Sequence, residues 1–178
     1  MKQGTGEAVS DDEALLRAEL LLLEAVREQR RCDLIDLADS PTSSEIAGWD
    51  DPSRMIRADV LRRLLLHGAH DQQTTRVDVR GAIITGDLDI EDTRIPTRIS
   101  LEYCQINFLN AHMTIFTESA SFNDVTFNKN ATFDKSTFSK KAWFDRTTFT
   151  QKVTFNETTF TQNAAFNKAI FTQNAAFK

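Results

Sequence analysis

The chain has 178 residues, 40% of them hydrophobic, which suits a single domain with a sizeable core. Phe occurs 13 times against a single Tyr, so one aromatic type dominates that core. The first 13 residues are polar and acidic, and the longest Leu run covers only residues 20–23, which predicts neither a secretory signal nor a membrane-spanning segment. The net charge is −5, with the excess of acids in residues 1–60 and a mildly basic balance in residues 111–178.

Two helices are predicted in the N-terminal part. The first is Leu-rich and is expected at about 11–31, because Ser10 and Glu13 have the spacing of a capping box. The second is expected at 52–67, because Pro52 suits the first position of a helix and an apolar stripe follows it at helical spacing.

The remainder of the chain has an 11-residue period, which is read from large apolar residues separated by alternating steps of 5 and 6. In each case a small or β-branched residue lies two positions earlier, and a polar residue follows almost throughout. The aromatic members of the series are Phe116, Phe122, Phe127, Phe133, Phe138, Phe144, Phe149, Phe155, Phe160, Phe166, Phe171 and Phe177. The aliphatic members upstream are Val79, Ile84, Ile90, Ile95, Leu101 and Ile106.

The period is interrupted once, because the interval from Ile106 to Phe116 is one position short of a full period. We predict that Ala111 fills the missing position with Leu109 before it, and that a bulge or register correction lies within 107–114.

Neither a helix, with its period of 3.6, nor a flat strand, with its period of 2, explains this spacing. A coil that turns a corner every five or six residues does explain it, since the large residue and the small one two before it both point inward. Successive coils then stack as parallel strands about 4.8 Å apart, and equivalent Phe rings form columns in the interior.

The motif small-x-Phe-polar-x resembles that of pentapeptide-repeat proteins, as in residues 131–135 and 164–168. The resemblance covers about 100 residues and implies a right-handed quadrilateral β-helix with four sides per coil. Alternating steps of 5 and 6 resemble a variant found in bacterial proteins, and four sides would then span two full periods. The extra residues should lie at alternate corners, near 129–130, 140–141 and 151–152. A flattened coil with two sides is the alternative.

We therefore predict a mainly β fold with two parts, an N-terminal helical cap segment at 1–72 and a pentapeptide-repeat β-solenoid at 73–178. A solenoid needs its open end covered, because the last coil exposes unpaired backbone and an apolar cross-section. Two amphipathic helices directly before the first coil suit that role.

The sequence predicts no catalytic, cofactor-binding or metal-binding residue, and hence no enzyme. Cys32 and Cys104 have no partner at metal-ligand spacing and are expected to be inert thiols in a reducing cytoplasm. His67 and His70 straddle a predicted helix end and lack a third ligand nearby. No nucleophile-elbow or phosphate-loop spacing occurs.

Charged residues two periods apart should stack on adjacent coils. Asp124 and Arg146 should form one opposite-charge pair and Lys135 and Glu157 another, whereas Arg146 and Lys168 should form a like-charge pair.

Four lysines near alternate corners are predicted to form one basic edge, either a solubility feature or a docking strip for an acidic partner. An outward-facing tryptophan accompanies them. These residues are Lys129, Lys140, Lys141, Lys152 and Trp143.

The favoured function is a non-enzymatic repeat scaffold that mediates protein–protein interaction or assembly. The alternative, implied by the resemblance, is a DNA mimic that binds a type II topoisomerase such as gyrase and protects it from inhibitors. That mimicry needs a strongly negative rod, whereas residues 77–178 hold 11 acids and 11 bases. We also expect an end-to-end homodimer through the C-terminal coil, as such proteins often form, and no nucleic-acid ligand.

Overall fold

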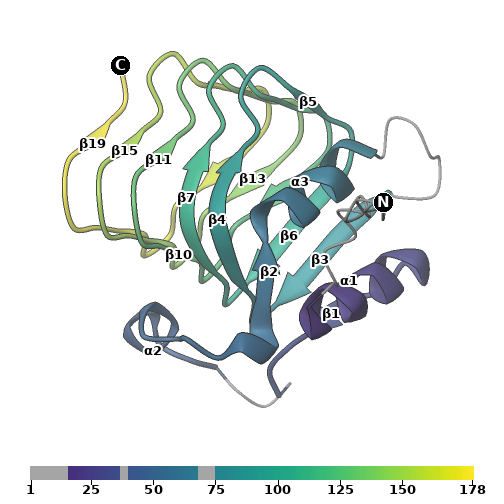
Figure 1. The fold of residues 1–178 in the computed structure, drawn as a ribbon. Helices are drawn as coiled ribbons and strands as arrows, with labels where there is room; N and C mark the ends of the chain where they lie inside the picture. The colour runs from purple at the N-terminus through teal and green to yellow at the C-terminus, as the bar shows by residue number, and fades with distance from the viewer. Residues whose placement is uncertain (1–15, 37–39, 68–74) are drawn as a thin grey trace, which may run out of the picture.

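The structure is a computed structural model, and it describes residues 16–36, 40–67 and 75–178. From Arg76 onward the chain winds as a β-solenoid of about five turns, whose strands pair in parallel with those of the adjacent turns (Figure 1). The prediction of a mainly β solenoid is confirmed, while the handedness of the coil stays a prediction.

Each complete turn has four sides, which we call a, b, c and d in chain order. Side a contains β3 (Arg76–Arg80), β6 (Arg98–Glu102), β9 (Ala120–Ser121), β13 (Ala142–Trp143) and β17 (Ala164–Ala165). Side b contains β10 (Thr126–Phe127), β14 (Thr148–Phe149) and β18 (Ile170–Phe171). Side c contains β11 (Ala131–Thr132), β15 (Val153–Thr154) and β19 (Ala175–Ala176). Side d contains β5 (Arg94–Ile95), β8 (Ile115–Phe116), β12 (Thr137–Phe138) and β16 (Thr159–Phe160).

Two longer strands, β4 (Ile83–Asp89) and β7 (Gln105–Asn110), run across sides b and c without a break. They join these two sides into one sheet, while sides a and d each form a separate sheet. In the regular turns the paired residues are two periods apart, for example Thr126 with Thr148 and Thr137 with Thr159. The four-sided cross-section is therefore confirmed, and the flattened alternative is excluded.

The register shifts where the spacing predicted an irregularity. Between Ile84 and Asp87, β4 has one residue more than the facing part of β7, so the missing residue lies at the start of the predicted range 107–114. Leu109 and Ala111 are fully buried, and they continue the inward positions after the shift.

The interior consists of stacked rings, as the period predicted. Rings at equivalent positions on adjacent turns lie nearly parallel, with interplanar angles of at most 15°. Their centroids are separated by 4.5 Å for Phe116 and Phe138 and by 5.3 Å for Phe149 and Phe171, the two extremes. This separation is close to the spacing of paired strands, about 4.8 Å, so rings and backbone repeat together.

The predicted anchors are buried in all but the last turn. Those with at most 3% of their surface exposed are Val79, Ile84, Ile90, Ile95, Leu101, Ile106, Phe116, Phe122, Phe127, Phe133, Phe138, Phe144, Phe149 and Phe155. Phe160, Phe166 and Phe171 are only partly buried, and Phe177 is 56% exposed. Burial of the inner columns therefore decreases toward the last turn.

The first helix, α1 (Arg17–Arg27), is shorter than the predicted 11–31. It begins at Arg17 because Leu16 is extended and its N–H donates to the Glu19 carboxylate, at 2.9 Å. It ends before Gln29, whose φ of 54° is incompatible with a continuing helix. The capping box expected at Ser10 lies outside the described residues.

The second predicted helix, 52–67, is wrong in its first two turns. Pro52–Arg54 forms a 3₁₀ turn, Met55–Arg57 forms the strand β2, and only Ala58–His67 forms a helix, α3. Ile56 is the physical reason, because it is fully buried and pairs with Ile84 at the base of an inner column.

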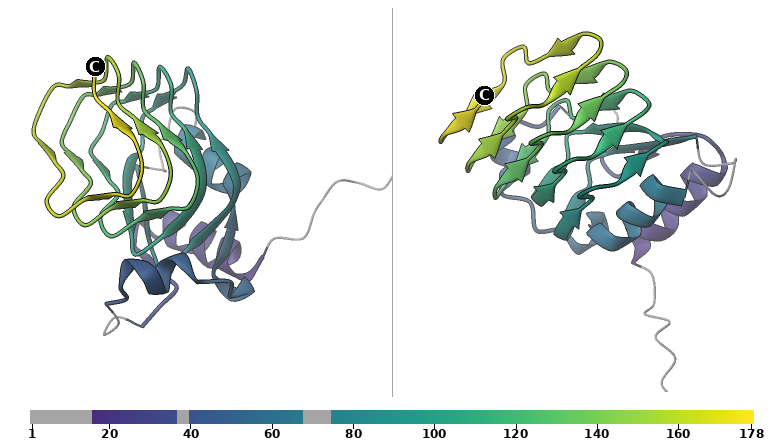
Figure 2. Two further views of the ribbon diagram at one scale, coloured as in Figure 1. Left: turned by 90° about the vertical axis from the view of Figure 1, so that its left-hand side faces the viewer. Right: turned by 90° about the horizontal axis from the view of Figure 1, so that it is seen from above.

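A second strand of the N-terminal segment, β1 (Cys32–Asp33), extends side a in the same way, because Cys32 pairs with Val79. The N-terminal segment therefore supplies part of a turn as well as helices. Apolar residues of α1 and α3, including Leu22 and Leu61, join the core cluster of the solenoid. Figure 2 shows both helices at the end of the stack opposite the C-terminus.

A buried ion pair connects α1 to β2. The Glu19 carboxylate is fully buried and accepts hydrogen bonds from the backbone N–H, Nε and Nη2 of Arg57, at 2.8–2.9 Å. Burial alone would raise the pKa of Glu19, but the hydrogen bonds from Arg57 and from the Leu16 N–H lower this pKa below its ordinary value.

We expect Phe144→Ala to destabilise the fold strongly, because the ring stacks between Phe122 and Phe166 with centroids 5.2 and 4.8 Å away. Loss of a buried ring costs about 3–5 kcal/mol. Phe177→Ala is the matched control, and its cost should be about 1 kcal/mol because the ring is 56% exposed. Urea denaturation followed by circular dichroism measures both values, and equal losses would contradict the stacked-core account.

We expect Glu19→Gln to lower the free energy of unfolding at pH 7 by about 3 kcal/mol, since it leaves Arg57 without its charged partner. The folded pKa of Glu19 is below the unfolded value of about 4.3, so the pair stabilises fully above that pH. This stabilisation is lost as the pH falls through the folded pKa. The difference between wild type and variant should therefore be constant from pH 6 to 8 and should shrink below about pH 4. A difference that grows on acidification would exclude the assignment.

Candidate interaction surface

The corners of the solenoid are of two kinds, which alternate along the chain. In the regular turns, successive large inward residues are five positions apart across the corners between sides a and b and between sides c and d, and six apart across the other two; we call these the short and the long corners. Each short corner contains one residue in the left-handed conformation, which is Gly81 in the first corner between a and b and a non-glycine residue in the others. The corner between a and b uses Tyr103, Asp124, Arg146 and Lys168, and the corner between c and d uses Asp92, Met113, Lys135 and Glu157, with φ from 49° to 58°. Residues two periods apart therefore occupy the same corner on successive turns.

Polar side chains next to these corners connect one turn to the next. The Asp145 N–H donates to Asn123 Oδ1 at 3.0 Å, and the Asn167 N–H donates to Asp145 Oδ1 at 2.8 Å. The Asn156 N–H donates to Asp134 Oδ1 in the same way, at 2.7 Å. Asn123, Asp134 and Asp145, each directly after a ring, therefore bind backbone of the following turn. The Thr residues that follow other rings donate instead to a carbonyl of the preceding turn, as Thr150 does to Phe127 at 2.8 Å.

The charge pairs predicted between adjacent turns are confirmed in part. Arg146 donates from Nε and Nη2 to both carboxylate oxygens of Asp124, at 2.7 and 2.6 Å. Lys135 and Glu157 occupy equivalent exposed corners, but their side chains form no ion pair with each other. Lys168 follows Arg146 at the next turn as a like charge.

The prediction that four lysines form one basic edge is wrong, because they lie at two different corners of the coil. Lys129 and Lys152 lie at the long corner between sides b and c, since they fall between β10 and β11 and between β14 and β15. Lys140 and Lys141 lie between β12 and β13, at the opposite corner, between sides d and a. Alternate corners of a four-sided coil are diagonal, so these lysines are on opposite sides of the rod. Trp143 is half-buried on the outer surface of side a.

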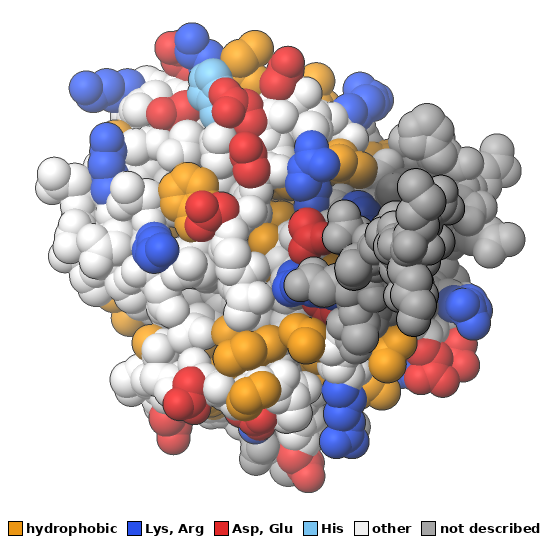
Figure 3. Space-filling model, in the orientation of Figure 1, with side chains coloured by type: hydrophobic (Ala, Val, Ile, Leu, Met, Phe, Trp, Pro, Cys, Tyr) orange, Lys and Arg blue, Asp and Glu red, His pale blue; other side chains and the backbone are white. Residues whose placement is uncertain are grey.

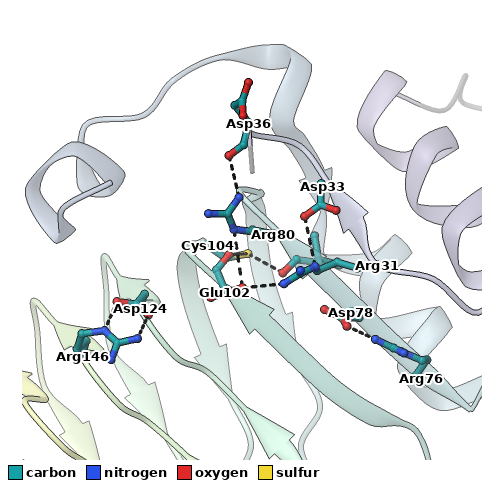
Figure 4. Close-up of polar contacts among 11 residues, drawn as sticks. Arg31, Asp33, Asp36, Arg76, Asp78, Arg80, Glu102, Cys104, Asp124 and Arg146 are labelled. Atoms are coloured by element: carbon teal, nitrogen blue, oxygen red, sulfur yellow. Dashed lines mark hydrogen bonds and ion pairs between the residues drawn. The ribbon is translucent and has the colours of Figure 1, made fainter. Parts of the chain in front are cut away.

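The segment that follows α1 is attached to the outside of the solenoid by charged residues. Arg31 Nη1 contacts Glu102 at 2.9 Å and Arg31 Nε contacts Asp33 at 3.3 Å (Figure 4). The Arg80 guanidinium donates to the Asp36 carbonyl at 2.8 Å and lies 5.0 Å from the centre of the Tyr103 ring.

A short helix, α2 (Ser43–Ala47), continues this segment against the outer surface of side b. Gln105 Nε2 donates to the Ala47 carbonyl at 2.9 Å, and Thr126 Oγ1 donates to the Ser43 carbonyl at 3.5 Å. The helix is capped at its start, because Thr42 and Glu45 form a capping box. The 11-residue period of the sequence could not predict this contact, because the paired residues are 58 and 83 positions apart.

A groove of about 410 Å³ separates α2 and the residues before it from the corner between sides a and b. We call it the α2 groove. It is lined by residues 40–43, Ile46, Tyr103, Asp124, Arg146, Lys168 and Ile170.

The two cysteines are core residues. Burial raises the pKa of the Cys32 thiol to about 11 and that of the Cys104 thiol to about 12, so both are protonated near neutral pH. Cys104 Sγ lies 3.3 Å from the Glu102 carbonyl, to which it donates. Both cysteines are free thiols.

Within residues 16–36, 40–67 and 75–178, no cluster of three or more His, Cys, Asp or Glu side chains could hold a metal ion. The side chain of His67 and the whole of His70 lie outside the described residues. None of the helices of this part of the chain is long and apolar enough to cross a membrane.

Comparison with known proteins identifies the repeat. Residues 133–178 match the family model described as pentapeptide repeats (9 copies). No curated protein and no solved structure matches the chain. The matched residues form the regular last turns, and residues 76–132 continue the same four-sided coil with aliphatic residues in place of the first rings. Residues 133–178 are therefore pentapeptide repeats, and the whole coil from residue 76 has the architecture of such a β-solenoid.

Proposed function

We propose that this protein is a non-enzymatic scaffold on which proteins assemble, and that its last turn pairs with the last turn of a second copy. The observation that carries the proposal is the contrast between the two ends of the inner columns. At the first turn the columns end under α1 and α3, whereas at the last turn Phe177 is 56% exposed and Phe160, Phe166 and Phe171 are only partly buried.

The backbone of the last turn supports this pairing. The strands β16, β17, β18 and β19 each pair with a strand of the preceding turn and lie at the edge of their sheets. Unpaired strand edges favour the addition of further strands, and exposed rings favour burial against an apolar surface. A second copy presents the same four-sided outline, so a two-fold arrangement would match side to side.

Charge argues against the alternative function as a DNA mimic. On the face shown in Figure 3, acidic and basic side chains are interspersed. The last turns carry cations at several corners, including Lys135, Arg146 and Lys168. A protein that competes with DNA for a site that binds phosphates needs a negatively charged surface. The alternative predicts a change in gyrase supercoiling at micromolar protein, and the scaffold proposal predicts none.

The two buried, free thiols support a location in the cytoplasm, where thiols stay reduced.

We expect the protein to self-associate as its concentration rises, and Phe177→Asp to abolish this association, because a carboxylate cannot be buried against the rings of a second copy without a large desolvation cost. Met113→Asp is the matched control, since Met113 is similarly exposed, at 47%, but lies at a corner far from the last turn. Sedimentation velocity over a hundredfold concentration range measures the effect. A monomer at all concentrations, or equal effects of the two variants, would contradict the proposed pairing.

A further inference from the structure

The α2 groove has one charged wall and a facing wall that combines hydroxyl groups with apolar side chains. The charged wall is the corner between sides a and b, where Asp124, Arg146 and Lys168 follow one another on successive turns. The apolar contribution comes from Pro41 and Ile46 on one side and from Ile170 at the outer end. Such a combination suits a ligand that carries both a charge and an apolar group.

The charged wall has an excess of positive charge. Asp124 is mostly buried and already binds Arg146 through both oxygens, so it is neutralised. The Arg146 side chain remains 54% exposed and retains Nη1 and one further N–H for another acceptor. Lys168 is exposed one turn away and has no ion pair among the described residues.

Stacked like charges on adjacent strands destabilise a sheet unless an anion lies between them. A carboxylate located between Arg146 and Lys168 would remove this repulsion and accept charge-assisted hydrogen bonds from both side chains. Hydroxyl groups of Ser40, Thr42 and Ser43 line the facing wall.

The facing wall is held in place before any ligand arrives. The Thr42 N–H donates to the Glu45 carboxylate at 2.7 Å, and Gln105 and Thr126 fix α2 to side b. A preformed site loses less conformational entropy when it binds a ligand than a site that must first order itself.

We propose that the α2 groove binds an acidic, extended peptide segment of a partner protein, with a carboxylate between Arg146 and Lys168 and a neighbouring apolar side chain against Pro41 and Ile170. That the partner is a protein rests on the proposed scaffold function. The chemistry of the walls favours a peptide over a nucleic acid, because the one aromatic ring in the groove, Tyr103, already has the Arg80 guanidinium over it.

The test is fluorescence anisotropy with a fluorescein-labelled ten-residue peptide of alternating Glu and Val. We expect Lys168→Gln to weaken binding about fivefold or more, because the variant removes the one cation of the groove that has no ion pair. Lys135→Gln is the matched control, since Lys135 has almost the same φ, 57° against 58°, and lies at the other short corner. It should bind as wild type does. Binding should also weaken as salt rises.

Three results would overturn the proposal. The first is that wild type and both variants bind the peptide equally. The second is that a peptide of alternating Gln and Val binds as well as the Glu-Val peptide. The third is that a ten-nucleotide oligothymidylate binds in preference to the peptide and depends on Lys168. Thermal melts of both variants show whether the fold is intact. Repeating the titration with Phe177→Asp separates the two proposals. If this variant no longer self-associates but still binds the peptide in a Lys168-dependent way, the assignment of the groove holds.

Discussion

The match between ring stacking and strand pairing determines the form of this protein. Rings one turn apart have centroids 4.5–5.3 Å apart, and paired strands repeat at about 4.8 Å, so each Phe covers the ring of the preceding turn without a change in backbone pitch. The two periodic interactions reinforce each other, since a shift in one would break the other. Because the interior is filled by such columns, the outer surfaces, the corners and the ends of the coil are the parts that face solvent.

The N-terminal segment both ends these columns and modifies the outer surface. Cys32 and Ile56 continue two inner columns downward from short strands, and the helices then cover the cross-section. Between the two strands the chain leaves the stack and places α2 against side b. The repeat alone would present similar surfaces at every turn. The segment that carries α2 makes the outer surface of side b different from the other three.

The repeated part was predictable because each position in the repeating unit has one physical role that recurs many times. The shift near Leu109 was predictable for the same reason, since a single missing residue interrupts a long series. β2 was not predictable, because Ile56, Val60 and Leu64 also have helical spacing and only the pairing with β4 decides between the two. The single basic edge failed because linear spacing does not show that alternate corners are diagonal. The α2 groove depends on contacts between distant segments that have no local signal.

The residues in the left-handed conformation at the corners differ in side chain from turn to turn, whereas the inward-facing positions repeat the same residue types. Tyr, Asp, Arg, Lys, Met and Glu all occupy that conformation here, although it costs a non-glycine residue on the order of 1 kcal/mol. Most of these side chains extend into solvent and make no demand on the ring columns. Single substitutions at these corners can therefore change the charge pattern on the surface of the solenoid without changing its core. The binding properties of such a coil can then vary independently of its fold.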